Sequence, residues 1–335
     1  MPVVELTSKL QFGIHFKDNL MTFSPEQIKE ILSKGLLGFP VTPFKDDLSF
    51  NEGRYRELYR QMASKGAVAL FPAGGAGELF SITPTEHRAI VAASVAEDAG
   101  LPNVVGVGGS VELAVEMARA AEAAGADGLL VCPPYLVGGE QSGLAAYVQR
   151  ICASVGVGVV VYNRDTLQLN ADTVVRLADD CKNFIGLKDG VGSIEGILSI
   201  QARLGDRLVL INGLPTAEIA AGAYGALGIR TYSSAVYCFA PELAMSFFSA
   251  TQTGDTATVE RLLRGFYLPL IDIRKRARGY AVSIVKAGLD AVGTPAGPVR
   301  PPLIELTDSL RRDLTALLRE FAPNDFVNNA GGLDG

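Results

Sequence analysis

Phe184-Ile185-Gly186-Leu187-Lys188-Asp189-Gly190 is a short apolar run that ends abruptly in a lysine. Strands of a parallel sheet that are covered on both faces read as nearly continuous apolar runs. The stretch therefore predicts a buried strand that carries the amine of Lys188 at its carboxyl end. The alternative, from this heptapeptide alone, is an exposed strand-end lysine that pairs with Asp189.

The same order, a short apolar segment followed by an amphipathic segment, recurs from residue 36 to residue 251. The predicted strands cover residues 36–42, 68–71, 104–107, 128–131, 157–162, 184–188, 208–212 and 228–232. The helices expected after them cover residues 50–65, 83–99, 111–124, 143–154, 171–177, 194–204, 216–224 and 241–251. About eight such regular pairs predict a (β/α)8 TIM barrel of the α/β class, and a doubly wound sheet is the alternative.

The alternation stops after residue 254, and helices are then expected over residues 256–278, 280–289 and 307–321. A Gly/Pro-rich stretch over residues 293–302 separates the last two of these helices. We therefore divide the chain into a barrel over residues 25–254 and a C-terminal helical appendage over residues 255–325. The last segment, residues 326–335, is expected to be a flexible tail.

Residues 1–24 are assigned to an N-terminal extension outside the barrel. Met21 is a second candidate for the native start, and the residues before it would then come from a cloning vector or a misassigned start codon. The beginning of the chain lacks the basic-then-apolar order of a signal peptide. The apolar stretches are also too short to span a bilayer. We expect a cytoplasmic protein that does not interact with membranes.

The composition excludes several classes of function. The formal net charge is −6, there is no Trp, and 48% of the 335 residues are hydrophobic. An acidic chain without an extended basic patch is unsuited to binding nucleic acid. The four cysteines are widely spaced and are expected to be free thiols. With only two histidines, a histidine-ligated metal site or a histidine-based triad is disfavoured.

A buried lysine at the mouth of a barrel has a specific chemical use. The amine of a free lysine, with a pKa of about 10.4, is almost entirely protonated at neutral pH, and only the neutral amine attacks a carbonyl. Desolvation disfavours the charged form and lowers the pKa. Lys188 is therefore a candidate nucleophile for a Schiff base with a keto substrate.

Other chemistry-bearing residues stand where predicted strands end, which is where reacting groups gather in this fold. Tyr162 ends the strand before that of Lys188 and is interpreted as a proton shuttle, although a lone strand-end tyrosine is often structural. Arg164 is interpreted as a carboxylate clamp in preference to an ordinary surface charge. Because side chains alternate along a strand, at most one of Ser233 and Ser234 can line the pocket directly.

Gly74, Gly75 and Ala76 form a turn after the second predicted strand. The turn fits neither a GxGxxG dinucleotide motif nor a P-loop. Its backbone N–H groups could form a nest for a carboxylate, and a tight turn with a packing role is an equally good interpretation. Tyr135 after the fourth strand and Gly213 after the seventh complete the residues assigned to substrate binding.

Taken together, Gly74-Gly75-Ala76-Gly77-Glu78, Tyr162-Asn163 and Gly186-Leu187-Lys188-Asp189 resemble, in order and spacing, the motifs of the dihydrodipicolinate synthase and N-acetylneuraminate lyase family. The resemblance implies a barrel enzyme in which Lys188 forms the Schiff base, Tyr162 is catalytic and Gly75-Ala76 holds a 2-oxo-acid carboxylate. It also implies a homo-oligomer, either a tetramer or a dimer. No cofactor is expected, because the lysine imine itself is the electron sink.

Further motifs are similar to a branch of this family that dehydrates and decarboxylates keto sugar diacids. They are Phe39-Pro40-Val41-Thr42, Tyr162-Asn163-Arg164-Asp165, Leu214-Pro215-Thr216-Ala217-Glu218, Thr231-Tyr232-Ser233-Ser234-Ala235-Val236 and Gly297-Pro298-Val299-Arg300. The family's synthases usually carry two hydroxyl side chains in the glycine loop and two adjacent tyrosines after the fourth strand, where this chain has Gly75-Ala76 and Tyr135-Leu136. The branch implies a small-molecule keto sugar diacid as substrate. The alternatives are a keto-sugar-acid aldolase or lyase of the same family and a non-catalytic keto-acid sensor.

Overall fold

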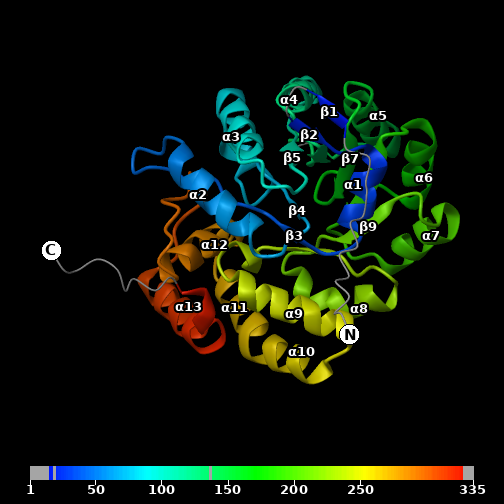
Figure 1. Ribbon diagram of the computed structural model, residues 1–335. Coiled ribbons are helices and arrows are strands. Elements are labelled where there is room, and N and C mark those ends of the chain that lie inside the picture. The colour runs from blue at the N-terminus through cyan, green and yellow to red at the C-terminus, as the bar shows by residue number, and fades with distance from the viewer. Residues whose placement is uncertain (1–14, 18–19, 136–137, 327–335) are drawn as a thin grey trace, which may run out of the picture.

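Eight parallel strands form a barrel at the centre of the computed structural model, which describes residues 15–17, 20–135 and 138–326 (Figure 1). The strands are β3 (Leu36–Gly38), β4 (Ala69–Leu70), β5 (Val104–Val107), β6 (Gly128–Val131), β7 (Gly158–Asn163), β8 (Phe184–Asp189), β9 (Val209–Asn212) and β10 (Tyr232–Ser234). Their order is β4-β3-β10-β9-β8-β7-β6-β5. The N–H of Leu70 donates to the carbonyl of Pro102 at 3.1 Å, which joins the two outer strands. The predicted (β/α)8 barrel is therefore confirmed.

A layer of helices surrounds the strands, and each strand is followed by one or more helical segments. They are α2 (Glu52–Ala63), α3 (Pro84–Ala96), α4 (Val111–Ala123), α5 (Gln141–Cys152), α6 (Ala171–Asp180), α7 (Ile194–Leu204), α8 (Ala221–Ala226) and α9 (Pro241–Thr253). Thr83 and Glu86 form a capping box at the start of α3, with Pro84 in the first turn. These helices lie within a few residues of the predicted ranges, except that a separate 3₁₀ turn, Ala217–Ala220, precedes α8.

The first and last barrel strands differ most from the predicted ranges. The strand expected over residues 36–42 ends at Gly38, and Pro40 lacks the N–H needed to continue the ladder. The strand expected over residues 228–232 begins only at Tyr232. Some of the residues before it terminate α8. The N–H groups of Gly228 and Ile229 donate to carbonyls within that helix, and Gly228 has a φ of 80°. The end of the first strand and the start of the last strand are therefore set by local backbone conformation, which a pattern of apolar residues does not reveal.

Helix α1 (Pro25–Leu32) closes the amino-terminal end of the barrel and was not among the helices expected from the sequence. A capping box between Ser24 and Gln27 starts it. Its Ile28 and Leu32 are fully buried in the same cluster as the inward-facing residues of the strands. The predicted N-terminal extension contains a short antiparallel pair, β1 (His15–Lys17) and β2 (Leu20–Thr22), and residues 1–14 lie outside the described residues.

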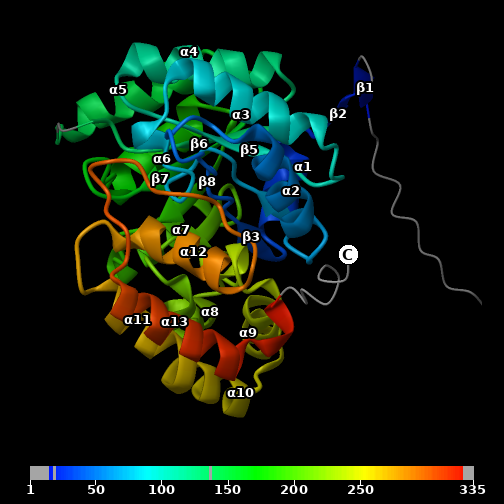
Figure 2. The ribbon, with the colours of Figure 1, turned by 90° about the vertical axis from the view of Figure 1, so that its left-hand side faces the viewer.

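The C-terminal appendage consists of α10 (Thr256–Leu262), α11 (Leu268–Arg274), α12 (Tyr280–Ala291) and α13 (Asp308–Phe321). A π-helical turn, Leu263–Tyr267, interrupts the helix expected over residues 256–278, and Pro269 is the second residue after it. A proline frees a carbonyl one turn earlier, which favours such a local widening. In both ribbon views α10, α11 and α13 lie together with α9 below the barrel strands (Figures 1 and 2). One hydrophobic cluster includes residues from both parts, so the appendage packs directly on the barrel. Residues 327–335 of the expected tail lie outside the described residues.

Helix α12 brings a lysine into contact with the loop after β4. The Nζ atom of Lys286 lies 2.8 Å from the Oε1 atom of Glu78, and the two side chains are 1% and 0% exposed. Lys286 also donates a hydrogen bond to the carbonyl of Pro298 at 2.7 Å. The backbone N–H of Arg300 donates to the other oxygen of Glu78 at 3.1 Å. The appendage therefore fixes the end of the glycine-rich turn that the sequence assigned to substrate binding.

Replacing Lys286 with methionine is expected to lower the free energy of unfolding by about 3–5 kcal/mol, because the charge of the buried Glu78 carboxylate would then lack its cation. The double variant Glu78→Gln/Lys286→Met should recover much of this loss, since it leaves no buried charge. Denaturant unfolding followed by circular dichroism measures both. Lys34→Met removes a surface ion pair with Glu30 and serves as control, with an expected change of about 0.5 kcal/mol or less. If the double variant lost as much free energy of unfolding as its two single variants together, this account of the pair would be contradicted.

Candidate active site

The ends of β7 and β8 place Tyr162 and Lys188 side by side, because the two residues are paired in the parallel register. Paired residues of neighbouring strands point to the same face of a sheet. Tyr162 belongs to the cluster that fills the barrel interior, so both side chains face the inside of the barrel at its carboxyl-terminal end. Lys188 is 3% exposed and Tyr162 is 9% exposed.

The amine of Lys188 is surrounded by rings and by one carbonyl. Its Nζ atom lies 3.4 Å from the ring centroid of Tyr162 and 5.2 Å from that of Phe39. The carbonyl oxygen of Gly213 is 3.5 Å away. Burial lowers the pKa of Lys188, the Tyr162 phenol acts in the opposite direction, and the Arg164 guanidinium lowers it again, so that the net pKa lies below its ordinary value. The site thus increases the fraction of neutral, nucleophilic amine.

Asp189 does not pair with Lys188, so the alternative of an exposed strand-end ion pair is wrong. Its side chain lies on the opposite side of β8 and accepts hydrogen bonds from the N–H groups of Val191 and Gly192, both at 3.1 Å, and from the hydroxyl of Tyr224. The carboxylate therefore shapes the loop after β8. Lys188 is therefore buried without an ion pair to Asp189, the next residue on β8.

Tyr162 is held by hydrogen bonds on both sides of its hydroxyl group. The hydroxyl donates to the carbonyl of Gly213 at 2.8 Å and accepts from Nη1 of Arg164 at 3.0 Å. Burial by itself raises the pKa of Tyr162, but the positive charges of Lys188 and Arg164 outweigh burial and lower the net pKa. This arrangement gives a phenol that can release and recover a proton beside the amine.

Gly213 has to be a glycine for Lys188 to occupy its place. A Cβ atom on Gly213 would lie 2.5 Å from Cγ and 2.9 Å from Nζ of Lys188, both too short for a normal contact. The backbone N–H of Gly213 donates to the carbonyl of Asp189 at 2.8 Å, so the backbone is fixed from β8. The sequence assigned Gly213 to substrate binding, and its observed contacts are with the lysine and the tyrosine.

The glycine-rich turn stands at the rim of the barrel interior. Gly74 is buried, Gly75 is exposed, and Ala76 packs against the interior cluster that contains Tyr162. Ala73 with φ of 52° and Glu78 with φ of 58° adopt left-handed conformations on either side. The carbonyls of Gly74 and Gly75 accept hydrogen bonds from Leu79 and Glu78 within the turn. Within the described residues the N–H groups of Gly75 and Ala76 donate no hydrogen bond, which leaves them available to an anion.

Strand β10 separates its two serines. Ser233 pairs in register with Leu37, an inward-facing residue, so its side chain faces the barrel interior. Ser234 is fully buried on the outer side, where it donates to Oε1 of Glu218 at 2.5 Å and accepts from the N–H of Tyr237 at 3.1 Å. Burial raises the pKa of Glu218 to about 7. The two serines thus face opposite sides of β10, as the alternation along a strand predicted, and Ser234 is turned away from the barrel interior.

The remaining predicted residues differ in position. Arg164 lies beside Tyr162, and its Nε atom lies 3.1 Å from Oδ2 of Asp165. Tyr135, by contrast, is 75% exposed in the loop after β6, whereas Lys188 is buried. Leu136, its neighbour in the predicted motif, lies outside the described residues.

Three residues near the amine or the phenol are not among the site residues predicted from the sequence. Phe39 faces Lys188 from the end of β3. Cys132 follows β6 and is close enough for Lys188 and Arg164 to act on its thiol, although burial still raises its pKa to about 11. Gly190 leaves space for its neighbours, since a Cβ there would lie 2.9 Å from Cε2 of Tyr162 and 3.0 Å from Cβ of Arg164. Phe39 and Gly190 stand in quoted motifs, but only the closed barrel shows what they touch.

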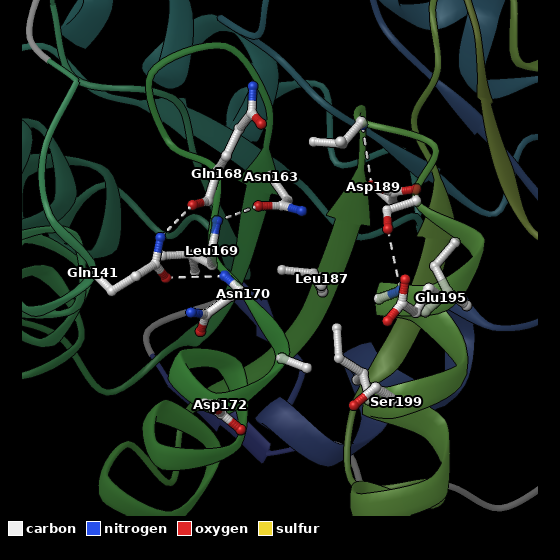
Figure 3. A pocket seen from close by; sticks show the side chains of 16 residues that line it. Gln141, Asn163, Gln168, Leu169, Asn170, Asp172, Leu187, Asp189, Glu195 and Ser199 are labelled. Atoms are coloured by element: carbon white, nitrogen blue, oxygen red, sulfur yellow. Dashed lines mark hydrogen bonds between the residues drawn. The ribbon is translucent and has the colours of Figure 1, made fainter.

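A separate pocket of about 500 Å³ opens between α6 and α7, on the outer side of β8 (Figure 3). Asn163 and Asp189, the outward-facing neighbours of the tyrosine and the lysine, stand at its upper end, and Leu187 lies on its floor. Hydrogen bonds already engage much of the polar lining, such as that from the N–H of Leu169 to Oδ1 of Asn163 at 2.7 Å. Because neither Lys188 nor Tyr162 lines this pocket, the barrel mouth is the better candidate for the chemistry.

The sequence model of the dihydrodipicolinate synthetase family matches residues 32–321 of the chain. A protein from Rhizobium rhizogenes named probable 5-dehydro-4-deoxyglucarate dehydratase is 51% identical over 284 residues, which is 85% of this chain and 94% of the relative. A protein of the same name from Methylobacterium radiotolerans is 51% identical over 300 residues, covering 89% of this chain and 99% of the relative.

Solved structures show the same architecture. Dihydrodipicolinate synthase from Bacillus clausii superimposes with a TM-score of 0.80 at 25% identity, over 88% of this chain and 99% of the other. YagE from E. coli K12, described as a member of the dihydrodipicolinic acid synthase family in complex with pyruvate, gives a TM-score of 0.77 at 25% identity, over 86% and 98% of the two chains. No helix in the described part of this chain has the length and apolar character needed to cross a membrane.

Proposed function

Because the chain belongs to the dihydrodipicolinate synthetase family, we propose that it is a lyase that converts 5-dehydro-4-deoxy-D-glucarate to 2,5-dioxopentanoate, water and carbon dioxide through a Schiff base on Lys188. The relatives at about 50% identity carry the name of this dehydratase and align over nearly their whole length. The observation that best supports Schiff-base chemistry is the buried amine of Lys188. It lies 3.4 Å from the ring centroid of Tyr162 and forms no ion pair with Asp189 of the same strand.

The reaction begins when the neutral amine of Lys188 attacks the keto carbon, C5, of the substrate. The carbinolamine that results must gain and lose protons before water leaves and the imine forms. The hydroxyl of Tyr162 is the group beside the amine that can move these protons. The N–H groups of Gly75 and Ala76 offer a binding place for the carboxylate next to the keto group.

The protonated imine then acts as an electron sink for the two remaining steps. A proton leaves C4, and the enamine that forms expels the C3 hydroxyl as water, which gives a conjugated iminium. The bond between C1 and C2 breaks, its electron pair enters this extended system, and C1 leaves as carbon dioxide. Protonation at C3, with loss of the enol proton, turns C2 into an aldehyde, and protonation at C4 turns the remaining enamine back into the imine. Hydrolysis of the imine releases 2,5-dioxopentanoate and returns Lys188.

Two groups at the mouth are suited to the distant part of the substrate. Ser233 faces the interior from β10, and the guanidinium of Arg164 carries a positive charge at the rim. Either can hold the departing hydroxyl or the second carboxylate by hydrogen bonding. The homo-oligomer, a dimer or a tetramer, and the cytoplasmic location stay predictions.

Borohydride trapping tests this proposal. The protein is incubated with 5-dehydro-4-deoxyglucarate, reduced and digested, and the adduct is located and weighed by peptide mass spectrometry. We expect an adduct on Lys188 with the mass of the substrate less water and carbon dioxide. A pyruvate-sized adduct would instead identify an aldolase or lyase of the same family. Failure of this and other 2-oxo acids to form any adduct would favour a non-catalytic sensor.

A further inference from the structure

Arg164 is held in one place by its backbone and by the residues around its side chain. Its N–H donates to the carbonyl of Leu167 at 3.0 Å, and the N–H of Leu167 donates back at 2.8 Å, which closes a tight turn at the end of β7. The side-chain stem passes over Gly190, where an added Cβ would lie 3.0 Å from Cβ and 3.2 Å from Cδ of Arg164. Asp165 binds the Nε edge of the guanidinium. The turn, Gly190 and Asp165 therefore direct the Nη1 edge toward Tyr162.

Two of the described partners of the Tyr162 hydroxyl, Gly213 and Arg164, have opposite requirements. The carbonyl of Gly213 accepts a hydrogen bond from the hydroxyl at 2.8 Å. This bond requires the proton on the hydroxyl and therefore favours the neutral phenol. Nη1 of Arg164, at 3.0 Å, can only donate, because a guanidinium has no acceptor. When the phenol gives up its proton, the contact with Arg164 becomes a charge-assisted hydrogen bond, which is stronger than a neutral one.

We propose that Arg164 is a positioning residue that holds the phenol oxygen of Tyr162 beside Lys188 and stabilises the phenolate while its proton is on the substrate. This inference rests on the proposed function, because the proton is needed for forming and collapsing the carbinolamine. The charged groups that act on Tyr162 are Lys188 from β8 and Arg164 from its own strand end, and the Cys132 thiol from the end of β6 lies near both of these cations. Asp165 faces the guanidinium from its outer side and leaves the positive charge only partly compensated.

A carboxylate clamp and a phenolate partner make different demands on Arg164. A clamp acts only when substrate is bound, so its loss raises KM and leaves the empty site unchanged. A phenolate partner acts in the empty site as well, so its loss changes the titration of Tyr162 without any ligand. Neighbouring opposite charges shift a pKa by about 1 to 3, which is large enough to measure.

The experiment follows the near-ultraviolet absorbance of phenolate during pH titration of the unliganded protein. The chain has no Trp, so tyrosine dominates this signal. Subtracting the titration of Tyr162→Phe from that of the wild type isolates Tyr162. Subtracting the titration of Arg164→Gln/Tyr162→Phe from that of Arg164→Gln isolates Tyr162 in a protein without the guanidinium. We expect Arg164→Gln to raise the pKa of Tyr162 by about 1 to 3, because a cation that favours the phenolate is lost.

Two further variants serve as controls. Arg164→Lys keeps the positive charge and should restore much of the wild-type titration. Arg203→Gln on α7 removes the same charge from a surface pair with Asp172 of α6 and should leave the pKa of Tyr162 unchanged. Arg164→Gln should also lower kcat by about tenfold or more and move the pH profile of kcat in the direction of the titration. If the pKa of Tyr162 in Arg164→Gln equalled that in the wild type, the inference would be overturned.

The titration and the trapping experiment can fail independently. The titration uses no substrate, so an unchanged phenol pKa removes the role of Arg164 and leaves the Schiff-base chemistry on Lys188 intact. A raised KM together with an unchanged titration would return Arg164 to the role of a clamp and overturn the inference as well.

Discussion

Replacing Lys188 with methionine is expected to abolish turnover of 5-dehydro-4-deoxyglucarate, with a loss on the order of 10⁴–10⁶-fold, as for the removal of other covalent nucleophiles. Methionine keeps most of the apolar stem that packs in the barrel, so the loss would come from the missing amine and not from a cavity. Steady-state kinetics measures the rate, and borohydride trapping should find no adduct at this position. Circular dichroism checks that the variant is folded.

The surface variant Lys182→Met is the matched control, because Lys182 lies exposed just before β8 and its amine donates to the carbonyl of Asp179 at 3.1 Å. Its activity should equal that of the wild type. Near-normal activity of Lys188→Met would show that the imine forms elsewhere or not at all, and the proposed mechanism would have to be given up.

Replacing Tyr162 with phenylalanine is expected to slow the reaction by about 10²–10⁴-fold, which is the usual contribution of a well-placed general acid or base. The ring that covers the amine of Lys188 remains, whereas the hydroxyl bonded to Gly213 and Arg164 is lost. The variant should therefore still form the imine, but more slowly. Single-turnover trapping on Lys188 at several incubation times separates the rate of imine formation from its extent.

A matched control for this change is Tyr147→Phe. Tyr147 is also buried, and its hydroxyl lies at a weaker 3.4 Å from the carbonyls of Gly109 and Cys132. We expect it to retain activity within a few-fold of the wild type. If Tyr162→Phe formed the imine as fast as the wild type, another group would have to carry the protons, and Tyr162 would be only a packing residue.

The amino-acid sequence by itself determined the order of the barrel strands and the helices between them, and the place of the buried amine of Lys188. The run Phe184–Asp189 is a strand in the structure, and Lys188 stands at its carboxyl end as predicted. Apolar runs and the 3.6-residue period of amphipathic helices are local properties, so a single chain reveals them without any knowledge of its contacts. The eight repeats then left few topologies to choose from.

The tertiary structure alone decided which groups meet at the mouth of the barrel. Closure brings Gly213 under the hydroxyl of Tyr162 and sets Ser233 toward the interior, while Ser234 turns outward to Glu218. Such contacts depend on strand register and on loop conformation, and a shift by one residue would reverse the direction of every side chain. The ion pair between Glu78 and Lys286 likewise joins residues far apart in the sequence, because only packing of the appendage against the barrel removes both charges from water.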